Sequence, residues 1–143
     1  EATPKKESAI IDSILHSEGQ YAKDLSIKKP SSNDFPRVSE NLVNDPLRYP
    51  NMEGRLVFKH AVTRMTELMH EILKRNQLTP QDVDFVIAQK THHTLDRYGN
   101  TTMATIPITF DEALQLQKIK RGQLVAFVAF GAGFTWGANL LRY

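Results

Sequence analysis

The chain has 143 residues, which is enough for one domain with a buried core. Apolar residues make up 41% and charged residues 24%, an ordinary balance for a folded domain that argues against disorder. The 18 Lys and Arg nearly offset the 16 Asp and Glu, so the net charge of +2 gives no reason to expect nucleic-acid or membrane binding, and the absence of cysteine excludes disulfides and a thiol nucleophile from these residues.

The N-terminal third predicts one strand and one long loop. Residues 9–15 (AIIDSIL) have a strand-like pattern, and residues 16–27 are expected to continue it as an extended hairpin. Residues 28–51 are rich in Pro, Ser, Asn and Asp, which predicts a loop of a length that often carries function. The first ten residues lack the apolar core of a signal peptide, so the pattern predicts a cytoplasmic protein.

The remainder alternates helix and strand patterns, which is typical of an α/β fold. Apolar residues recur at helical spacing over residues 53–76, and a second helix is expected over residues 101–117. Residues 83–88 predict a buried strand, and the following THHTL (residues 91–95) has a second β-pattern.

The longest apolar stretch is LVAFVAFGAGFTWGANLL, residues 124–141. It approaches the roughly 20 residues of a membrane-spanning helix. Three glycines, a threonine and an asparagine interrupt it, however, so we predict two buried strands joined by a glycine turn.

Two short segments are candidates for chemistry. Gly99-Asn100-Thr101-Thr102 precedes the second helix, where Asn or Thr can simply cap the first turn. In that position a side-chain amide can also donate a hydrogen bond to a carbonyl oxygen that becomes negative during a reaction. Gly131, Ala132 and Gly133 form a turn that can likewise be structural, or can leave backbone N–H groups open to a substrate oxygen.

The histidines do not predict a metal site. His92 and His93 are adjacent, so in a strand they would point to opposite faces of the sheet. His60 and His70 are not at the i, i+4 spacing of a helical metal-binding pair. The sequence also contains no phosphate-binding glycine loop and no hydrolase nucleophile elbow.

Taken together, the segments are more specific than any single motif. LDRYGNTTMATIPITFDEA and IKRGQLVAFVAFGAGFTWGANLLRY closely resemble the C-terminal half of 3-oxoacyl-[acyl-carrier-protein] synthase III, a condensing-enzyme family of the thiolase superfamily. NMEGRLVFKHAV resembles the family's Met-x-Gly-x-x-Val-Phe helix start, and IIDSILHSEGQYAKDL is similar to its mid-chain strand and loop. The resemblance implies an α/β fold with a mixed sheet and packed helices, incomplete relative to the family.

The resemblance also implies an acyltransferase of fatty acid biosynthesis. An acyl group from acyl-CoA is loaded on a cysteine and is then condensed with malonyl-acyl carrier protein, with loss of carbon dioxide. Asn100 matches the family's catalytic asparagine, and the N–H of Ala132 matches an oxyanion-hole donor at the second glycine of a Gly-Gly-Gly turn. Met52, Arg55 and Phe58, together with Gly131 and Gly133, match positions along the CoA and pantetheine tunnel. Neither a metal nor a cofactor is implied, and a homodimer is expected.

The chain departs from the family in two ways. The half that carries the nucleophilic cysteine is absent, and the helix that begins with the family's His-Gln-Ala-Asn motif is missing after residues 88–90. His92 and His93 match ordinary strand positions and do not replace the motif histidine. We therefore divide the chain into a mid-chain segment (1–27), a long loop (28–51) and a C-terminal thiolase-like domain (52–143).

Three hypotheses remain open. In the first, the chain is a piece of a complete synthase. In the second, it is a catalytically incomplete subunit that pairs with a complete partner. In the third, it belongs to a related synthase of the same fold that makes polyketides or other β-keto products. The length of the loop at 28–51 is the feature that favours a different substrate.

Overall fold

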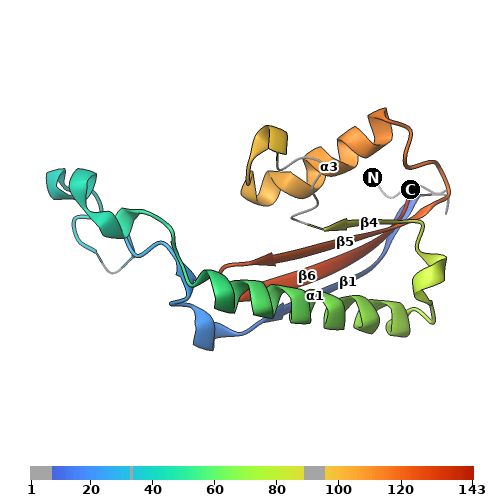
Figure 1. Ribbon diagram of the computed structural model, residues 1–143, viewed down its shortest axis with the longest axis horizontal. Helices are drawn as coiled ribbons and strands as arrows, with labels where there is room; N and C mark the ends of the chain where they lie inside the picture. Colours follow the sequence, from blue (N-terminus) through green and yellow to red (C-terminus); the bar gives the residue numbers. More distant parts are fainter. Residues whose placement is uncertain (1–7, 33, 89–95) are drawn as a thin grey trace.

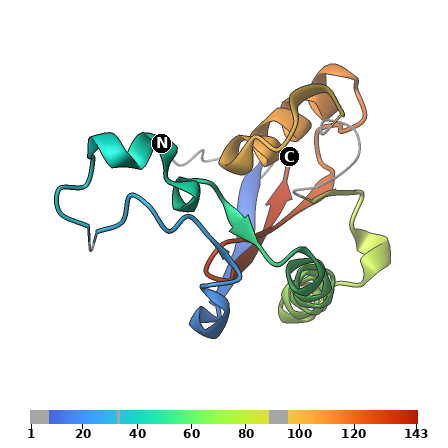
Figure 2. The ribbon, with the colours of Figure 1, turned by 60° about the vertical axis from the view of Figure 1, so that its left-hand side comes forward.

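The computed structural model describes residues 8–32, 34–88 and 96–143. A mixed β-sheet lies between two helices, with one helix on each face (Figure 1). Figure 2 shows α1 almost end-on on one side of the sheet and α3 on the other. The α/β class expected from the alternating patterns is therefore confirmed.

Within the described residues, the sheet has four strands in the order β1-β6-β5-β4. β1 (Ala9–Ser17) and β5 (Leu124–Gly131) both pair antiparallel with β6 (Thr135–Arg142), whereas β4 (Phe85–Ala88) pairs parallel with β5. The parallel pair needs a crossover connection, and α3 lies within it. The C-terminal hairpin predicted from residues 124–141 is confirmed as β5 and β6.

The two helices cover opposite faces of the sheet, and β5 contributes buried residues to both. α1 (Gly54–Arg75) packs Leu68 and Ile72 against Ala126 and Leu140. α3 (Thr105–Gln115) packs Ala113 against Ile87 and Val125 on the opposite face. Because neighbouring side chains of a strand point to opposite faces, β5 is buried on both sides, which explains its nearly continuous apolar sequence.

The predicted loop at 28–51 is an arm that projects beyond the sheet (Figure 1). A two-residue ladder between β2 (Leu25–Ser26) and β3 (Asn51–Met52) closes its base. The arm contains two short 3-10 helices, η2 (Glu40–Asn44) and η3 (Pro46–Arg48).

The expected hairpin over residues 16–27 is wrong. β1 ends at Ser17, and the 3-10 helix η1 (Gly19–Tyr21) follows it. β1 pairs instead with the C-terminal strand β6, a partner that is distant in the sequence. Local periodicity identifies a strand but does not identify the strand with which it pairs.

The second α-helix begins later than the predicted residue 101. The short helix η5 (Thr102–Ala104) precedes α3, and the α-helix itself starts at Thr105. Pro107 lies in the first turn of α3, where its missing N–H has no intrahelical partner to lose.

The β-pattern at 91–95, with His92 and His93, lies outside the described residues. No helix in the described parts of the chain is long and apolar enough to cross a membrane.

Candidate functional site

The candidate residues occupy three segments: the start of α1, the turn between β5 and β6, and the segment before α3. In Figure 1 all three lie toward the end of the sheet from which the arm projects. The start of α1 and the turn are in direct contact, because Val57 shares a core cluster with Phe130 and Phe134. Within the described residues, no hydrogen bond joins Asn100 to the turn.

The turn presents a backbone donor at Ala132. Gly133 has a φ of 133°, a conformation that side-chain-bearing residues rarely adopt. Ala132 does not have a positive φ, so alanine is compatible with the backbone at the second position of the turn. Ala132 is exposed, and within the described chain its N–H has no acceptor. This donor is thus available to a ligand oxygen.

Phe134 fixes the turn to the rest of the domain. Its side chain is fully buried, and its backbone exchanges two hydrogen bonds with Glu18, of 2.8 Å and 3.0 Å. Its ring stacks on Tyr21 with centroids 5.1 Å apart and contacts His60 of α1 at 5.5 Å. Glu18 and η1 on one side, and the N-terminal part of α1 on the other, therefore hold the turn.

Met52, Arg55 and Phe58 lie on the outside of the same region. Met52 is 55% exposed and Phe58 is 72% exposed, and Arg55 is also exposed. Val57, between them, is buried against the turn, as the helical period requires. The three side chains point away from the core, so a ligand can reach them.

Asn100 lies in a strained segment. Gly99 and Thr102 have φ values of 67° and 55°, and a left-handed conformation is unusual for a β-branched residue such as Thr102. The Thr102 N–H donates to the Asn100 side-chain carbonyl oxygen Oδ1 at 3.0 Å. Because only the oxygen can accept from this N–H, the Nδ2 donor of the amide is directed away from its own backbone.

The two interpretations of Asn100 are therefore compatible. Its oxygen stabilises the start of η5, as a local cap would, while its NH2 group can donate to a ligand. Asn100 does not directly follow a strand, because Asp96, Arg97 and Tyr98 are helical.

An ion pair ties this segment to α3. Arg97 Nη2 lies 2.5 Å from Glu112 Oε2, and the Glu112 side chain is mostly buried. The hydrogen bond from Arg97 lowers the pKa of Glu112, and a hydrogen bond from Tyr98 lowers it further, although burial acts in the opposite direction. The same carboxylate raises the pKa of Tyr98 by accepting its hydrogen bond.

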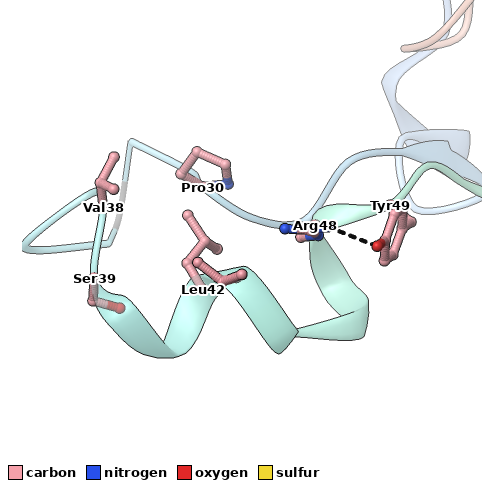
Figure 3. Close-up of a pocket in the computed structure, with 7 residues that line it drawn as sticks. Pro30, Val38, Ser39, Leu42, Arg48 and Tyr49 are labelled. Atoms are coloured by element: carbon pink, nitrogen blue, oxygen red, sulfur yellow. Dashed lines mark hydrogen bonds between the residues drawn. The ribbon is translucent and has the colours of Figure 1, made fainter.

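Neither Asn100 nor Ala132 lines either of two surface hollows. One, of about 310 Å³, is in the arm, where Pro30, Val38 and Leu42 form apolar walls and Arg48 donates to the Tyr49 hydroxyl (Figure 3). The other, of about 260 Å³, lies between β4 and α3 and includes Glu112. Among the described residues, no cluster of three His, Cys, Asp or Glu side chains is placed to hold a metal.

Sequence reasoning missed the residues that support the turn. Thr135 donates from Oγ1 to the Ala132 carbonyl oxygen at 2.9 Å. Phe134 and Thr135 directly follow the glycine turn in the sequence, but Tyr21 and Glu18 are more than 100 residues away. Only a pairing of β1 with β6 brings these last two residues to the turn.

The mixed sheet between two helices, with a glycine turn at one end, is the C-terminal half of a thiolase-like fold. A 3-oxoacyl-[acyl-carrier-protein] synthase III from Aquifex aeolicus matches 99% of this chain and 47% of its own, with a TM-score of 0.81 and 30% identity. The corresponding Thermus thermophilus structure matches 97% of this chain and 47% of its own, with a TM-score of 0.81 and 28% identity.

Sequence comparisons give the same result. Residues 88–143 match the model for the C-terminal part of 3-oxoacyl-[acyl-carrier-protein] synthase III. The beta-ketoacyl-[acyl-carrier-protein] synthases III of Pseudoalteromonas atlantica and Methylococcus capsulatus are 32% and 36% identical over 96% of this chain, which spans 47% and 46% of those relatives. In both sequence and fold, the chain matches the C-terminal half of 3-oxoacyl-[acyl-carrier-protein] synthase III. It spans about half the length of the relatives it matches.

Proposed function

We propose that the chain is the C-terminal half of an acyltransferase of fatty acid biosynthesis. The acyltransferase condenses an acyl group from acyl-CoA with malonyl-acyl carrier protein. The observation that carries the proposal is that two separate donors, the Asn100 Nδ2 and the Ala132 N–H, both lack a hydrogen-bond acceptor among the described residues. A two-step acyl transfer develops negative charge on two different carbonyl oxygens, so it needs two such donors.

The first step loads the acyl group on a cysteine. The thiolate bonds to the acyl carbon, and the carbonyl electron pair moves to the oxygen. This oxygen accepts a hydrogen bond from the Ala132 N–H. When the carbonyl re-forms, the carbon–sulfur bond to CoA breaks, and CoA leaves as a thiolate that takes up a proton. Met52, Arg55 and Phe58, with Gly131 and Gly133, are assigned to the passage that holds CoA and pantetheine.

The second step forms the new carbon–carbon bond. The malonyl group loses carbon dioxide, and the electron pair of the broken bond moves into an enolate whose oxygen accepts a hydrogen bond from Asn100. The enolate carbon then attacks the acyl-cysteine carbonyl, and the cysteine leaves as a thiolate. A hydrogen-bond donor placed for the enolate accelerates this step specifically, because the charge on that oxygen develops only there.

The nucleophile must come from outside these 143 residues, which contain no cysteine. Two observations support a larger assembly. A Porphyromonas gingivalis relative, 35% identical, aligns over 162 positions with the whole of this 143-residue chain, so that relative contains residues within the matched region that this chain lacks. Large apolar side chains are also exposed across several elements: Leu15 83%, Phe58 72%, Val62 53%, Met103 91% and Leu116 63%.

The absent cysteine equally supports a second candidate, a catalytically incomplete subunit that pairs with a complete partner. The intact mass of the purified natural protein separates the two. A mass about twice the 16.3 kDa of this chain, with a reactive cysteine, supports the complete synthase. A mass near 16.3 kDa supports the subunit and contradicts the complete enzyme.

Several assignments remain proposals with this function. We assign acyl-CoA and malonyl-acyl carrier protein as substrates, with no additional cofactor, and expect a cytoplasmic homodimer. The division at 1–27, 28–51 and 52–143, with a family helix missing after 88–90, also stays a prediction.

Asn100→Ala in the complete protein tests the proposed chemistry. Loss of one donor to a developing oxyanion typically lowers a rate by about 10² to 10³. We expect condensation and malonyl decarboxylation to slow by this factor, and acyl loading to change much less. Asn139→Ala, an exposed asparagine on β6, is the matched control. Unchanged decarboxylation in Asn100→Ala would exclude the role assigned to Asn100.

A further inference from the structure

The Thr135 side chain lies against the turn that carries the Ala132 donor. Its Oγ1 donates to the Ala132 carbonyl oxygen at 2.9 Å. The same Oγ1 lies 3.7 Å from the position that a Cβ would occupy on Gly131. Its methyl carbon Cγ2 lies 2.9 Å from the corresponding position on Gly133. One exposed side chain thus spans the inside of the turn.

The hydrogen bond constrains the peptide that follows Ala132. Fixing the Ala132 carbonyl fixes the orientation of the Ala132–Gly133 peptide plane, and hence the ψ angle of Ala132. Phe134 holds the other side of the turn through its buried ring and its two backbone bonds to Glu18. On the N-terminal side, Gly131 is the last residue of β5 and pairs with Thr135 of β6. The Gly131–Ala132 peptide with its N–H lies between this pairing and the restrained Ala132 carbonyl, which limits its rotation.

A glycine turn without this bond would be mobile. Gly131 and Gly133 flank Ala132, and glycine restricts the backbone least of all residues. A donor that acts on a developing oxyanion is effective when its position is set before the reaction, because no energy is then spent on reorganising it. The Thr135 hydroxyl supplies the restraint that the glycines do not.

We propose that Thr135 is a positioning residue, whose hydroxyl holds the Ala132 N–H in the direction of the acyl oxygen. The proposal rests on the proposed function for its kinetic consequence. Its structural part, that Thr135 holds the turn rigid, can be tested separately on the turn itself.

Two substitutions separate the hydroxyl from the rest of the side chain. Thr135→Val removes the donor and keeps the shape, whereas Thr135→Ser keeps the donor and removes the methyl group. Thr66→Val is the matched control, because Thr66 is also exposed and also donates from Oγ1 to a backbone carbonyl, that of Val62 at 2.8 Å, within α1.

The kinetic measurement follows acyl loading from acyl-CoA in the complete protein. Because a misplaced donor weakens the transition state more than the bound substrate, we expect Thr135→Val to lower kcat by about tenfold with KM within about twofold. Thr135→Ser and Thr66→Val should both stay within about twofold of the wild type. Equal kcat values in all variants would overturn the proposal, as would a loss that Thr135→Ser does not restore.

The structural measurement is the ¹⁵N order parameter of the Ala132 amide. Rigid backbone gives about 0.85, and flexible backbone gives less than about 0.6. We expect the wild type, Thr135→Ser and Thr66→Val to remain in the rigid range and Thr135→Val to fall toward the flexible one. An unchanged value in Thr135→Val would show that the hydroxyl does not hold the turn. A wild-type protein without acyl transfer would refute the proposed function, and this measurement would still decide the role of Thr135.

Discussion

Replacing Gly133 by alanine should destabilise the turn between β5 and β6 for two separable reasons. The φ of 133° lies in a region that is nearly exclusive to glycine. A Cβ at this position would also lie 2.9 Å from Thr135 Cγ2 and 3.3 Å from the Thr135 backbone nitrogen. The first cost belongs to the backbone, and the second depends on the neighbouring side chain.

The two costs can be estimated separately. Holding a residue with a side chain in such a conformation costs about 1–3 kcal/mol. The contact with Cγ2 adds about 1 kcal/mol, the low end for overpacking, because Thr135 is exposed and can shift. The free energy of unfolding should therefore fall by about 2–4 kcal/mol.

Urea unfolding followed by circular dichroism measures this loss. The matched control is Gly131→Ala, whose Cβ would meet only Thr135 Oγ1 at an ordinary 3.7 Å and whose φ is not in the left-handed region. It should stay within about 0.5 kcal/mol of the wild type. In the double mutant Gly133→Ala/Thr135→Ser, removal of Cγ2 should recover about 1 kcal/mol of the loss.

Two results would refute this reasoning. If Gly133→Ala and Gly131→Ala had equal effects, the positive φ would not be a constraint. If the double mutant recovered the whole loss, the cost would be steric, and the conformation would be open to alanine.

Three further predictions concern other parts of the structure. Phe134→Ala should lower the free energy of unfolding by about 3–5 kcal/mol in urea titrations, whereas Phe35→Ala, at a fully exposed side chain, should change it by less than about 0.5 kcal/mol. Thr102→Asn should raise the free energy of unfolding by about 0.5–1 kcal/mol, and with it the urea midpoint, because asparagine tolerates the left-handed conformation better than a β-branched residue. A lower urea midpoint would contradict the strain assigned to Thr102. Glu112→Gln should remove a contribution to the free energy of unfolding that depends on pH. Arg97 lowers the pKa of Glu112 in the folded state, so the ionised carboxylate stabilises the fold at pH values above its ordinary pKa of 4.5. This stabilisation is lost as the pH falls through the folded-state pKa. The difference in urea midpoint between wild type and Glu112→Gln should therefore be constant near neutral pH and shrink in acid, and a difference that grows in acid would reverse the sign of this argument.

Local patterns predicted the helices and the C-terminal hairpin well. The apolar stripe of residues 53–76 became α1, and the glycine-interrupted apolar run became β5 and β6, because periodicity and turn chemistry are properties of neighbouring residues. Asn100 and Ala132 were selected from the family resemblance, and their catalytic roles stay predictions.

Tertiary structure alone decided how these pieces combine. The β1–β6 pairing replaced the expected hairpin over residues 16–27, because strand partners depend on contacts between distant segments. The same pairing brings Glu18 to Phe134 and sets the restraints on the turn.

The Gly-Asn-Thr sequence also does not predict which end of the Asn100 amide, the oxygen or the NH2 group, faces its own backbone. The Thr102 N–H donates to the Asn100 side-chain oxygen, and this hydrogen bond determines which end of the amide is left to meet a ligand. Residue type supplies a donor, but the direction of that donor depends on backbone angles and packing that only the folded chain specifies.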